Sequence, residues 1–459
     1  MSHGGLIDQA SRWISASELV ILLLTSPLFL FPRPSLTPAL LLLPLLWLAR
    51  HHSRGHFVPR TPVDWPILGL LIMTLTSIWA TPDLLFSFGK IVGLIYHIAI
   101  FYAIVNWGQH QRSLLIVALV VVGLGSGAAF LSLLGTQWMV KWSVMRRILP
   151  YLPPLIRGLP GNELGFNPNQ VSGALIIFVP LQLALLAGSI LDVSLSKVWR
   201  FWGVLALLLS LSLNVAVVLL AQSRVAWMAL ALGLIGMVGI AARRLRLFVG
   251  VIVVASAVVL VVVGPVGVTE WLVQRGWMVG SGEVSWAGRV ELWTRALGTI
   301  ADLPLAGTGM NMFRRVVWYL YPLYHFPYGQ DIGHAHNLYL QAALDLGLPG
   351  LICYLALVGG ALALGWHCYA NSLHRSTRRL VLGSLTGLVV HATWGMTDIV
   401  ALGAKQGFLW WAVLALLVTA VVQDGRERKG SQDWPVERST GVVAPGRHDQ
   451  IRDEEPGAG

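Results

Sequence analysis

The chain contains repeated apolar blocks of about 17 to 25 residues, and this feature restricts its fold more than any other. A block of this length crosses roughly 30 Å of hydrocarbon as an α-helix, and the blocks lack the period-2 alternation of a membrane barrel. Only 12% of the 459 residues are charged, whereas an ordinary soluble domain has roughly 25%. The sequence therefore predicts an all-α, polytopic integral membrane protein.

About twelve apolar segments are predicted to cross the membrane. Their approximate ranges are 17–33, 36–49, 65–81, 88–106, 113–134, 170–189, 201–221, 224–241, 246–264, 338–365, 379–396 and 407–422. The boundary with the weakest signal is Gln222-Ser223-Arg224, where a long apolar block is divided without glycine or proline. The first block lacks an A-x-A-like cleavage site and further spans follow, so we expect the first helix to remain as an anchor.

Lysine and arginine lie in short clusters in alternate connections, which predicts the orientation of the chain. The clustered residues are Arg50, Arg54, Arg60, Arg112, Lys197, Arg200, Arg243, Arg244, Arg246, Arg375, Arg378 and Arg379. The bias predicts that both termini are cytoplasmic and that segments 135–169 and 265–337 face outward. The net charge of +11 does not indicate a nucleic-acid partner, because the positive residues form no continuous stripe.

Three regions are expected along the chain. Residues 1–160 hold the N-terminal helices and the first outer loop, and residues 161–422 hold a membrane core with the large outer loop 265–337. Residues 423–459 are rich in charge, glycine and proline and are predicted to be a disordered cytoplasmic tail.

The large outer loop is predicted to contain an amphipathic helix from Trp286 to Asp302 at the membrane surface. Its polar arc holds Glu291 and Arg295, four residues apart, which are expected to form a solvated pair. Arg289 projects onto the edge of the apolar arc, where an unpaired charge is costly, so it is expected to need an anionic partner.

A second polar motif, His334-Ala335-His336-Asn337, directly precedes an apolar helix in this loop. Asn337 suits the N-cap position, which places His336 beside the positive end of the helix dipole. Anionic groups are favoured at such a helix start.

These motifs, with others along the chain, resemble the O-antigen ligases and the related O-antigen polymerases. The resemblance covers roughly residues 160–420. It rests on Asn167-Pro168-Asn169, Ser223-Arg224, Arg289, Trp293, Pro304, Gly307-Thr308-Gly309, His336-Asn337-Leu338-Tyr339-Leu340-Gln341 and Leu346-Gly347-Leu348-Pro349-Gly350.

The resemblance implies a metal-independent, inverting glycosyltransferase of cell-envelope polysaccharide or lipopolysaccharide biosynthesis in the bacterial inner membrane. The donor would be a glycan on a polyprenyl diphosphate such as undecaprenyl diphosphate, and the acceptor a lipid or saccharide hydroxyl at the outer face. No cofactor is expected. Ligases and polymerases share these motifs and differ in the acceptor, so both interpretations stay open.

Such a transfer needs a base near the acceptor hydroxyl and cations around the departing diphosphate. The resemblance assigns His336 as the base, and Arg289 and Arg224 as the cations. The structural alternatives are a helix-start histidine that hydrogen-bonds the loop and an interfacial arginine that extends toward headgroups. Further candidates for substrate binding are Arg157, Asn167, Asn169, His334, Arg314 and Arg315.

Two other interpretations follow from the residues alone. His334, His336 and Asp331 are competent metal ligands and could form a cation site. A transporter or flippase is the alternative class, for which ionisable residues in the middle of several spans would be expected. Few such residues occur here, with His97 and His391 the main candidates.

The predicted orientation can be tested with single cysteines in a background where Cys353 and Cys368 are replaced by serine. A cysteine in the segment 265–337 should react with a membrane-impermeant thiol reagent in intact spheroplasts, and one between Arg243 and Arg246 should react only after permeabilisation. Labelling of the second position alone in intact cells would reverse the orientation.

Overall fold

A computed structural model describes residues 3–111, 113–152, 155–159, 162–191, 196–277 and 282–432. In these residues the chain is all-helical, with isolated bridges such as Thr136 to Phe166 and no β-strand. The α-helices are α1 (His3–Leu24), α2 (Ser26–Leu30), α3 (Leu42–Arg54), α4 (Asp64–Ala80), α5 (Leu84–Gly108), α6 (Leu114–Gly135), α7 (Pro168–Leu175), α8 (Phe178–Leu191), α9 (Lys197–Leu220), α10 (Arg224–Ala241), α11 (Arg246–Val262), α12 (Gly264–Gln274), α13 (Gly282–Asp302), α14 (Phe313–Leu320), α15 (Leu338–Asn371), α16 (Arg375–Trp394) and α17 (Phe408–Gln432).

A helix occupies each of the twelve segments that were predicted to cross the membrane. In the described part of the chain, seven helical segments are long and apolar enough to do so: Leu84–Gly108, Leu114–Gly135, Pro168–Ile190, Lys197–Leu220, Arg224–Ala241, Leu338–Asn371 and Lys405–Arg428. Two shorter apolar helices cover Asp64–Ala80 and Arg246–Ser256. The chain is therefore a polytopic all-α membrane protein, and the count of twelve spans remains a prediction.

The predicted boundary with the weakest signal, Gln222-Ser223-Arg224, coincides with the gap between two helices. α9 ends at Leu220 and α10 begins at Arg224. The turn is made by Gln222, whose φ of 53° is uncommon for a residue with a side chain. The buried amide oxygen of Gln222 accepts hydrogen bonds from the main-chain N–H groups of Lys141 and Trp142, at 2.9 and 2.8 Å. These bonds offset the energetic cost of the left-handed backbone at Gln222.

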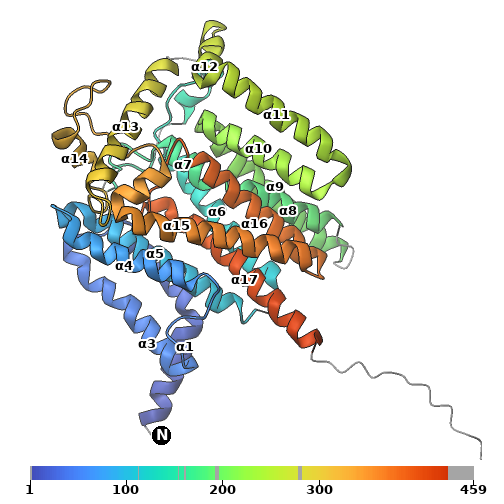
Figure 1. Ribbon diagram of the computed structural model, residues 1–459. Coiled ribbons are helices and arrows are strands. Elements are labelled where there is room, and N and C mark those ends of the chain that lie inside the picture. The colour runs from blue at the N-terminus through green and yellow to red at the C-terminus, as the bar shows by residue number, and fades with distance from the viewer. Residues whose placement is uncertain are drawn as a thin grey trace, which may run out of the picture.

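The connections that carry polar motifs gather at one end of the helix bundle, which we call the loop end. It comprises the described residues of segments 136–167, 263–337 and 395–407, and Figure 1 shows α12, α13 and α14 there, far from the N-terminus. This grouping agrees with the alternation of the predicted spans. The side of the membrane that the loop end faces remains a prediction.

A glycine kink in α15 and two main-chain hydrogen bonds hold the segment after α13 on the membrane core. α15 is kinked at Gly347, where φ is 70° and a Cβ would approach the carbonyl oxygen of Leu305 to 2.2 Å. Across this kink the N–H of Leu348 donates to Pro304 O and the N–H of Thr308 donates to Leu344 O, each at 2.7 Å. The segment after α13 is therefore joined to α15 through its main chain.

The amphipathic helix is present as α13, but its faces differ from the prediction. Leu292 and Ala296 are fully buried, and the Glu291 side chain is 8% exposed. Glu291 accepts hydrogen bonds from the N–H groups of Tyr324 and His325, at 2.7 and 2.9 Å. Its distance to Arg295 is 4.0 Å. The predicted i,i+4 pair is thus present at the limit of ion-pair distance, but the predicted solvation of Glu291 is wrong, because the loop that follows α14 covers this face and hydrogen-bonds to the carboxylate.

The far end of the bundle contains a buried ion pair between α1 and α3. Arg50 and Glu18, 0% and 2% exposed, form a salt bridge in which Arg50 Nε donates to Glu18 at 3.0 Å. Asn106 of α5 also donates to Glu18, at 3.1 Å. The carboxylate thus links three helices. At the C-terminal end, α17 continues to Gln432, ten residues beyond the predicted span, and the rest of the predicted disordered tail lies outside the described residues.

We predict that Glu18→Gln lowers the free energy of unfolding by roughly 3 kcal/mol, because it leaves the buried Arg50 charge uncompensated. Thermal unfolding of the purified protein in detergent measures the effect. Asp8→Asn is the matched control, since the Asp8–His52 pair joins the same two helices but is 55% and 50% exposed. Equal thermal unfolding midpoints for the two variants would show that the buried pair stabilises the protein no more than the exposed pair.

Candidate functional site

The histidine motif lies where the long loop after α14 enters α15. Asn337 is the N-cap of α15, as predicted, and its side-chain oxygen accepts the N–H groups of Tyr339 and Leu340, each at 3.0 Å. His336 precedes this cap with a φ of 49°. A non-glycine residue in this left-handed region is strained by about 1–3 kcal/mol, and such strain is concentrated at functional sites.

The end of α16 is held against the same point. The N–H of Leu338 donates to Gly395 O at 2.7 Å, and Asn337 Nδ2 donates to Met396 O at 2.9 Å. These bonds place the segment after α16 beside His336. The side chain that it presents there is Asp398, which is 3% exposed.

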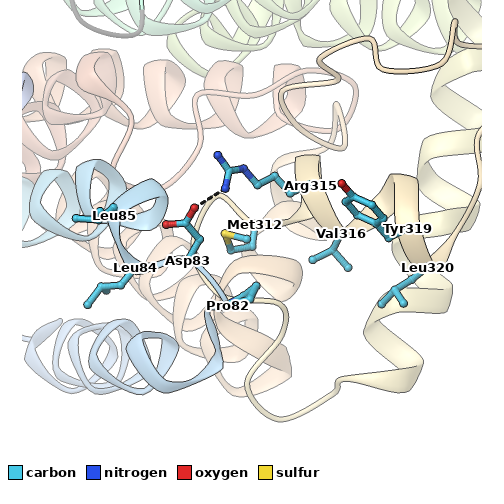
Figure 2. A pocket seen from close by; sticks show the side chains of 9 residues that line it. All are labelled: Pro82, Asp83, Leu84, Leu85, Met312, Arg315, Val316, Tyr319 and Leu320. Carbon is cyan, nitrogen blue, oxygen red and sulfur yellow. Dashed lines mark hydrogen bonds and ion pairs between the residues drawn. The ribbon is translucent and has the colours of Figure 1, made fainter.

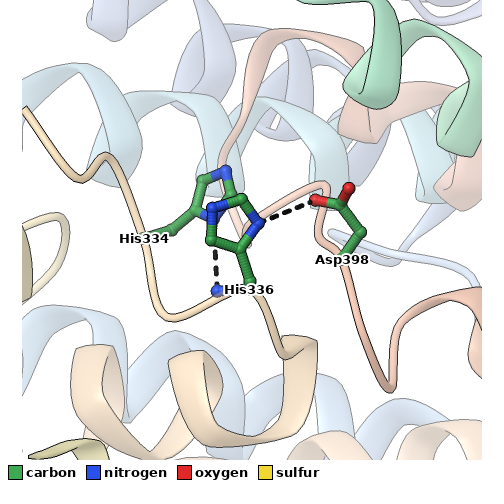
Figure 3. Close-up of side chains that lie close together, drawn as sticks. All are labelled: His334, His336 and Asp398. Atoms are coloured by element: carbon green, nitrogen blue, oxygen red, sulfur yellow. Dashed lines mark hydrogen bonds and ion pairs between the residues drawn. The ribbon is translucent and has the colours of Figure 1, made fainter. Parts of the chain in front are cut away.

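Asp398 faces the imidazole of His336 (Figure 3). Asp398 Oδ1 lies 3.4 Å from His336 Nδ1, within ion-pair distance but without the alignment of a hydrogen bond, and it accepts the N–H of Ile399 at 2.9 Å. Burial alone would raise the pKa of Asp398, but His336, His334 and Arg289 lower it below its ordinary value. Asp398 is therefore a carboxylate that can fix the orientation of the His336 ring.

His334 packs edge-on against His336, with ring centroids 4.3 Å apart. Its Nδ1 accepts the main-chain N–H of His336 at 3.3 Å. Burial, followed by repulsion from His336, lowers the pKa of His334 to about 3, so its imidazole is neutral at pH 7. A neutral ring whose Nδ1 is an acceptor carries its proton on Nε2.

Two cations, Arg289 and Lys141, lie close to Asp398, and a third, Arg224, lies close to both of them. Arg289 of α13 donates from Nε to the carbonyl oxygen of Thr397 at 3.0 Å, one residue before Asp398. Arg224, the first residue of α10, is within electrostatic range of Arg289. Lys141 is within range of Asp398, Arg224 and Arg289. Residues far apart in the sequence thus form one positively charged cluster, Lys141–Arg224–Arg289, which we call the cation cluster.

Lys141 was not found from the sequence, although two hydrogen bonds position it in the structure. Its ammonium donates to Asn169 Oδ1 at 2.8 Å, and its main-chain N–H is held by Gln222. Burial lowers the pKa of Lys141, while the charge of Asp398 opposes this shift. A single lysine in a loop has no sequence motif that would predict these contacts. Asp398 was likewise not assigned to the site from the sequence, because its contact with His336 depends on two helix ends that meet in space.

The other predicted substrate-binding residues lie in separate parts of the structure. Asn167 is the N-cap of α7 and accepts the N–H of Asn169 at 2.9 Å, which gives it a role at the start of this helix. Asn169 instead contacts the cation cluster through Lys141. Arg157 is exposed in the loop between α6 and α7.

Arg314 and Arg315 lie on α14, and each is paired with a carboxylate. Arg314 forms a salt bridge with Asp331, and Arg315 forms one with Asp83 beside a pocket of about 770 Å³ (Figure 2). Both guanidinium groups also lie over the Phe86 ring, at 5.4 and 3.8 Å from its centroid. They thus join α14 to the start of α5.

The residues that could hold a metal ion differ from the predicted set. Asp331, the carboxylate predicted for this site, is paired with Arg314 instead. Asp398 lies beside the two histidines, so that His334, His336 and Asp398 offer three ligand atoms within 4.8 Å of one another. Two imidazoles and a carboxylate are a competent set for a divalent cation. The expectation of a metal-independent reaction thus remains a prediction.

The fold and the site define a multi-pass α-helical membrane protein with a histidine–aspartate pair and a cation cluster at one end of its bundle. Residues 205–355, about a third of the chain, match the family model described as O-antigen ligase, and this match supports the O-antigen ligase family for the chain. The matched segment includes Arg224, Arg289 and His336. No curated protein matches the chain. The family match supports a membrane enzyme of the ligase or polymerase kind.

Proposed function

We propose that the protein is a glycosyltransferase that moves a glycan from a polyprenyl diphosphate to an acceptor hydroxyl at the outer face of the bacterial inner membrane. The observation that supports this most is the place of His336, which faces the buried carboxylate of Asp398 beside the cation cluster. A base and a diphosphate-binding group are the two elements that this transfer requires.

In the proposed reaction, the acceptor hydroxyl oxygen attacks the anomeric carbon of the donor sugar from the face opposite the diphosphate. The new glycosidic bond forms as the carbon–oxygen bond to the diphosphate breaks, with inversion. His336 Nε2 takes the hydroxyl proton, and Asp398 at Nδ1 stabilises the imidazolium that results. His334 supports the ring of His336 without taking the proton, because its lowered pKa makes it a weak base, its Nδ1 already accepts a hydrogen bond and its Nε2 carries a proton.

The cation cluster would bind the diphosphate as its negative charge increases in the transition state. The planar guanidinium groups of Arg224 and Arg289 can each make two parallel hydrogen bonds to phosphate oxygens, and Lys141 adds a point charge. The same site would serve a ligase, which transfers the glycan to a different lipid or saccharide, or a polymerase, which transfers it to another lipid-linked glycan.

We predict that His336→Ala reduces transfer by roughly a hundredfold or more, the scale of a removed general base, while the protein inserts and folds normally. The rate is measured with purified protein and a defined lipid-linked glycan. His334→Ala is the control and should lose much less activity. Equal, mild losses in both variants would contradict the role of His336 as base.

We also predict that Arg224→Lys and Arg289→Lys each reduce the rate more than about tenfold, because lysine keeps the charge but lacks the planar fork. Arg147→Lys is the control, since Arg147 is exposed in the loop between α6 and α7. Activity should persist in EDTA. If EDTA abolished transfer and a divalent metal restored it, a metal site at His334, His336 and Asp398 would replace this mechanism.

A further inference from the structure

Two side chains in the first turns of α15 connect a buried carboxylate to the loop that carries His336. Asp345 Oδ1 accepts a hydrogen bond from Gln341 Nε2 at 2.8 Å, and Gln341 Oε1 accepts the main-chain N–H of Ala335 at 3.0 Å. Gln341 and Asp345 are four residues apart, so they lie on the same face of the helix, and we call them the α15 pair. Their side chains are 3% and 1% exposed, and the proposed reaction uses neither.

The carboxylate of Asp345 determines which way the amide of Gln341 points. An ionised carboxylate only accepts hydrogen bonds, so the NH2 group of Gln341 faces it and the amide oxygen faces Ala335. Asp345 Oδ1 also accepts the main-chain N–H of Asn311 at 3.0 Å. Lys90 of α5 lies within electrostatic range of Asp345, and its positive charge offsets part of the cost of burying the carboxylate.

The α15 pair holds two loops that each contain a residue with a left-handed backbone. Among the residues that the structure describes, three with side chains have a positive φ: Gln222, Asn311 and His336. Asn311, with a φ of 67°, is bonded to Asp345 directly, and His336, with a φ of 49°, directly follows Ala335. Such a conformation persists only where the surrounding structure fixes it. The α15 pair supplies that constraint for both loops.

We propose that Gln341 and Asp345 are positioning residues that hold His336 in the orientation required for proton transfer. The inference rests on the proposed function, in which His336 takes the proton of the acceptor hydroxyl. The bond from Ala335 fixes the main chain one residue before His336, while Asp398 contacts the imidazole itself (Figure 3). Without the amide of Gln341, the backbone at His336 can relax from its left-handed conformation. The imidazole then moves relative to Asp398 and the acceptor, and a displacement of about 1 Å can cost roughly a hundredfold in rate.

Gln341→Leu tests the inference, because leucine has a similar volume but accepts no hydrogen bond. We expect kcat for transfer to fall about tenfold or more, while KM for the lipid-linked donor changes less than about twofold, since the cation cluster is unaltered. The kinetics use full-length purified protein with a defined lipid-linked glycan, and thermal unfolding verifies that each variant is folded. Gln182→Leu on α8 is the matched control, because Gln182 is also buried and bonds only Ser210 of α9 among the printed contacts of its side chain.

The control should keep its kcat. An unchanged kcat in Gln341→Leu, or equal losses in the two leucine variants, would overturn the inference.

An exchange of charge within the α15 pair tests the hydrogen bonds themselves. Gln341→Glu alone places a carboxylate oxygen where the Gln341 nitrogen now lies, 2.8 Å from Asp345 Oδ1, and the repulsion should lower kcat about tenfold. Adding Asp345→Asn provides an amide that donates to the new carboxylate, and its oxygen can still accept the N–H of Asn311. The double variant should recover kcat to within about threefold of the wild type. Absence of recovery would contradict a role through these bonds.

A double-mutant cycle with His336 separates the inference from the function on which it rests. If Gln341 acts through His336, Gln341→Leu should cost less than about twofold in a His336→Ala background. Losses that multiply would show that Gln341 acts independently of His336, and the inference would be wrong while the proposed function stood. If His336→Ala alone kept full activity, the base assignment itself would be wrong, and the positioning role would be wrong with it.

Discussion

The hydrogen bonds that join the start of α15 to the end of α16 determine the geometry of the candidate site. Leu338 N–H to Gly395 O, Asn337 Nδ2 to Met396 O and the Tyr339 hydroxyl to Ala392 O, at 2.7, 2.9 and 2.8 Å, connect two helix ends that lie about sixty residues apart. Backbone groups at a helix end have no partner within the helix, so each end here satisfies the other. A consequence of this junction is that the residues just outside it, His336 and Asp398, face each other across a buried contact.

The cation cluster limits the kind of ligand that suits the candidate site. Arg224, Arg289 and Lys141 come from separate segments of the chain and meet at the loop end of the bundle. A charge at membrane depth is costly, so cations gathered at the end of a span favour an anionic partner. The diphosphate of the proposed lipid-linked donor meets this condition.

Sequence motifs and structure agree most closely where a local rule applies. Asn337 is the N-cap that its position before an apolar helix predicts. The long apolar block is divided into two helices at Gln222, as the alternation of the predicted spans required. The prediction for Glu291 was wrong because helical periodicity describes only the helix itself. The loop that later covers α13 could not be read from the periodicity, and it converts a supposedly solvated carboxylate into a buried acceptor.

The sequence by itself determined the class of fold, the helices at the predicted spans and the motif residues, because apolar block length, helix caps and glycine signals act over a few neighbouring positions. Tertiary structure alone decided that Asp398 is the partner of His336, that Asp331 pairs with Arg314, and that Lys141 joins Arg224 and Arg289. These pairings depend on how separate segments of the chain meet in space. Periodicity and cap signals describe only neighbouring positions, so they do not predict contacts between residues that lie farther apart in the sequence.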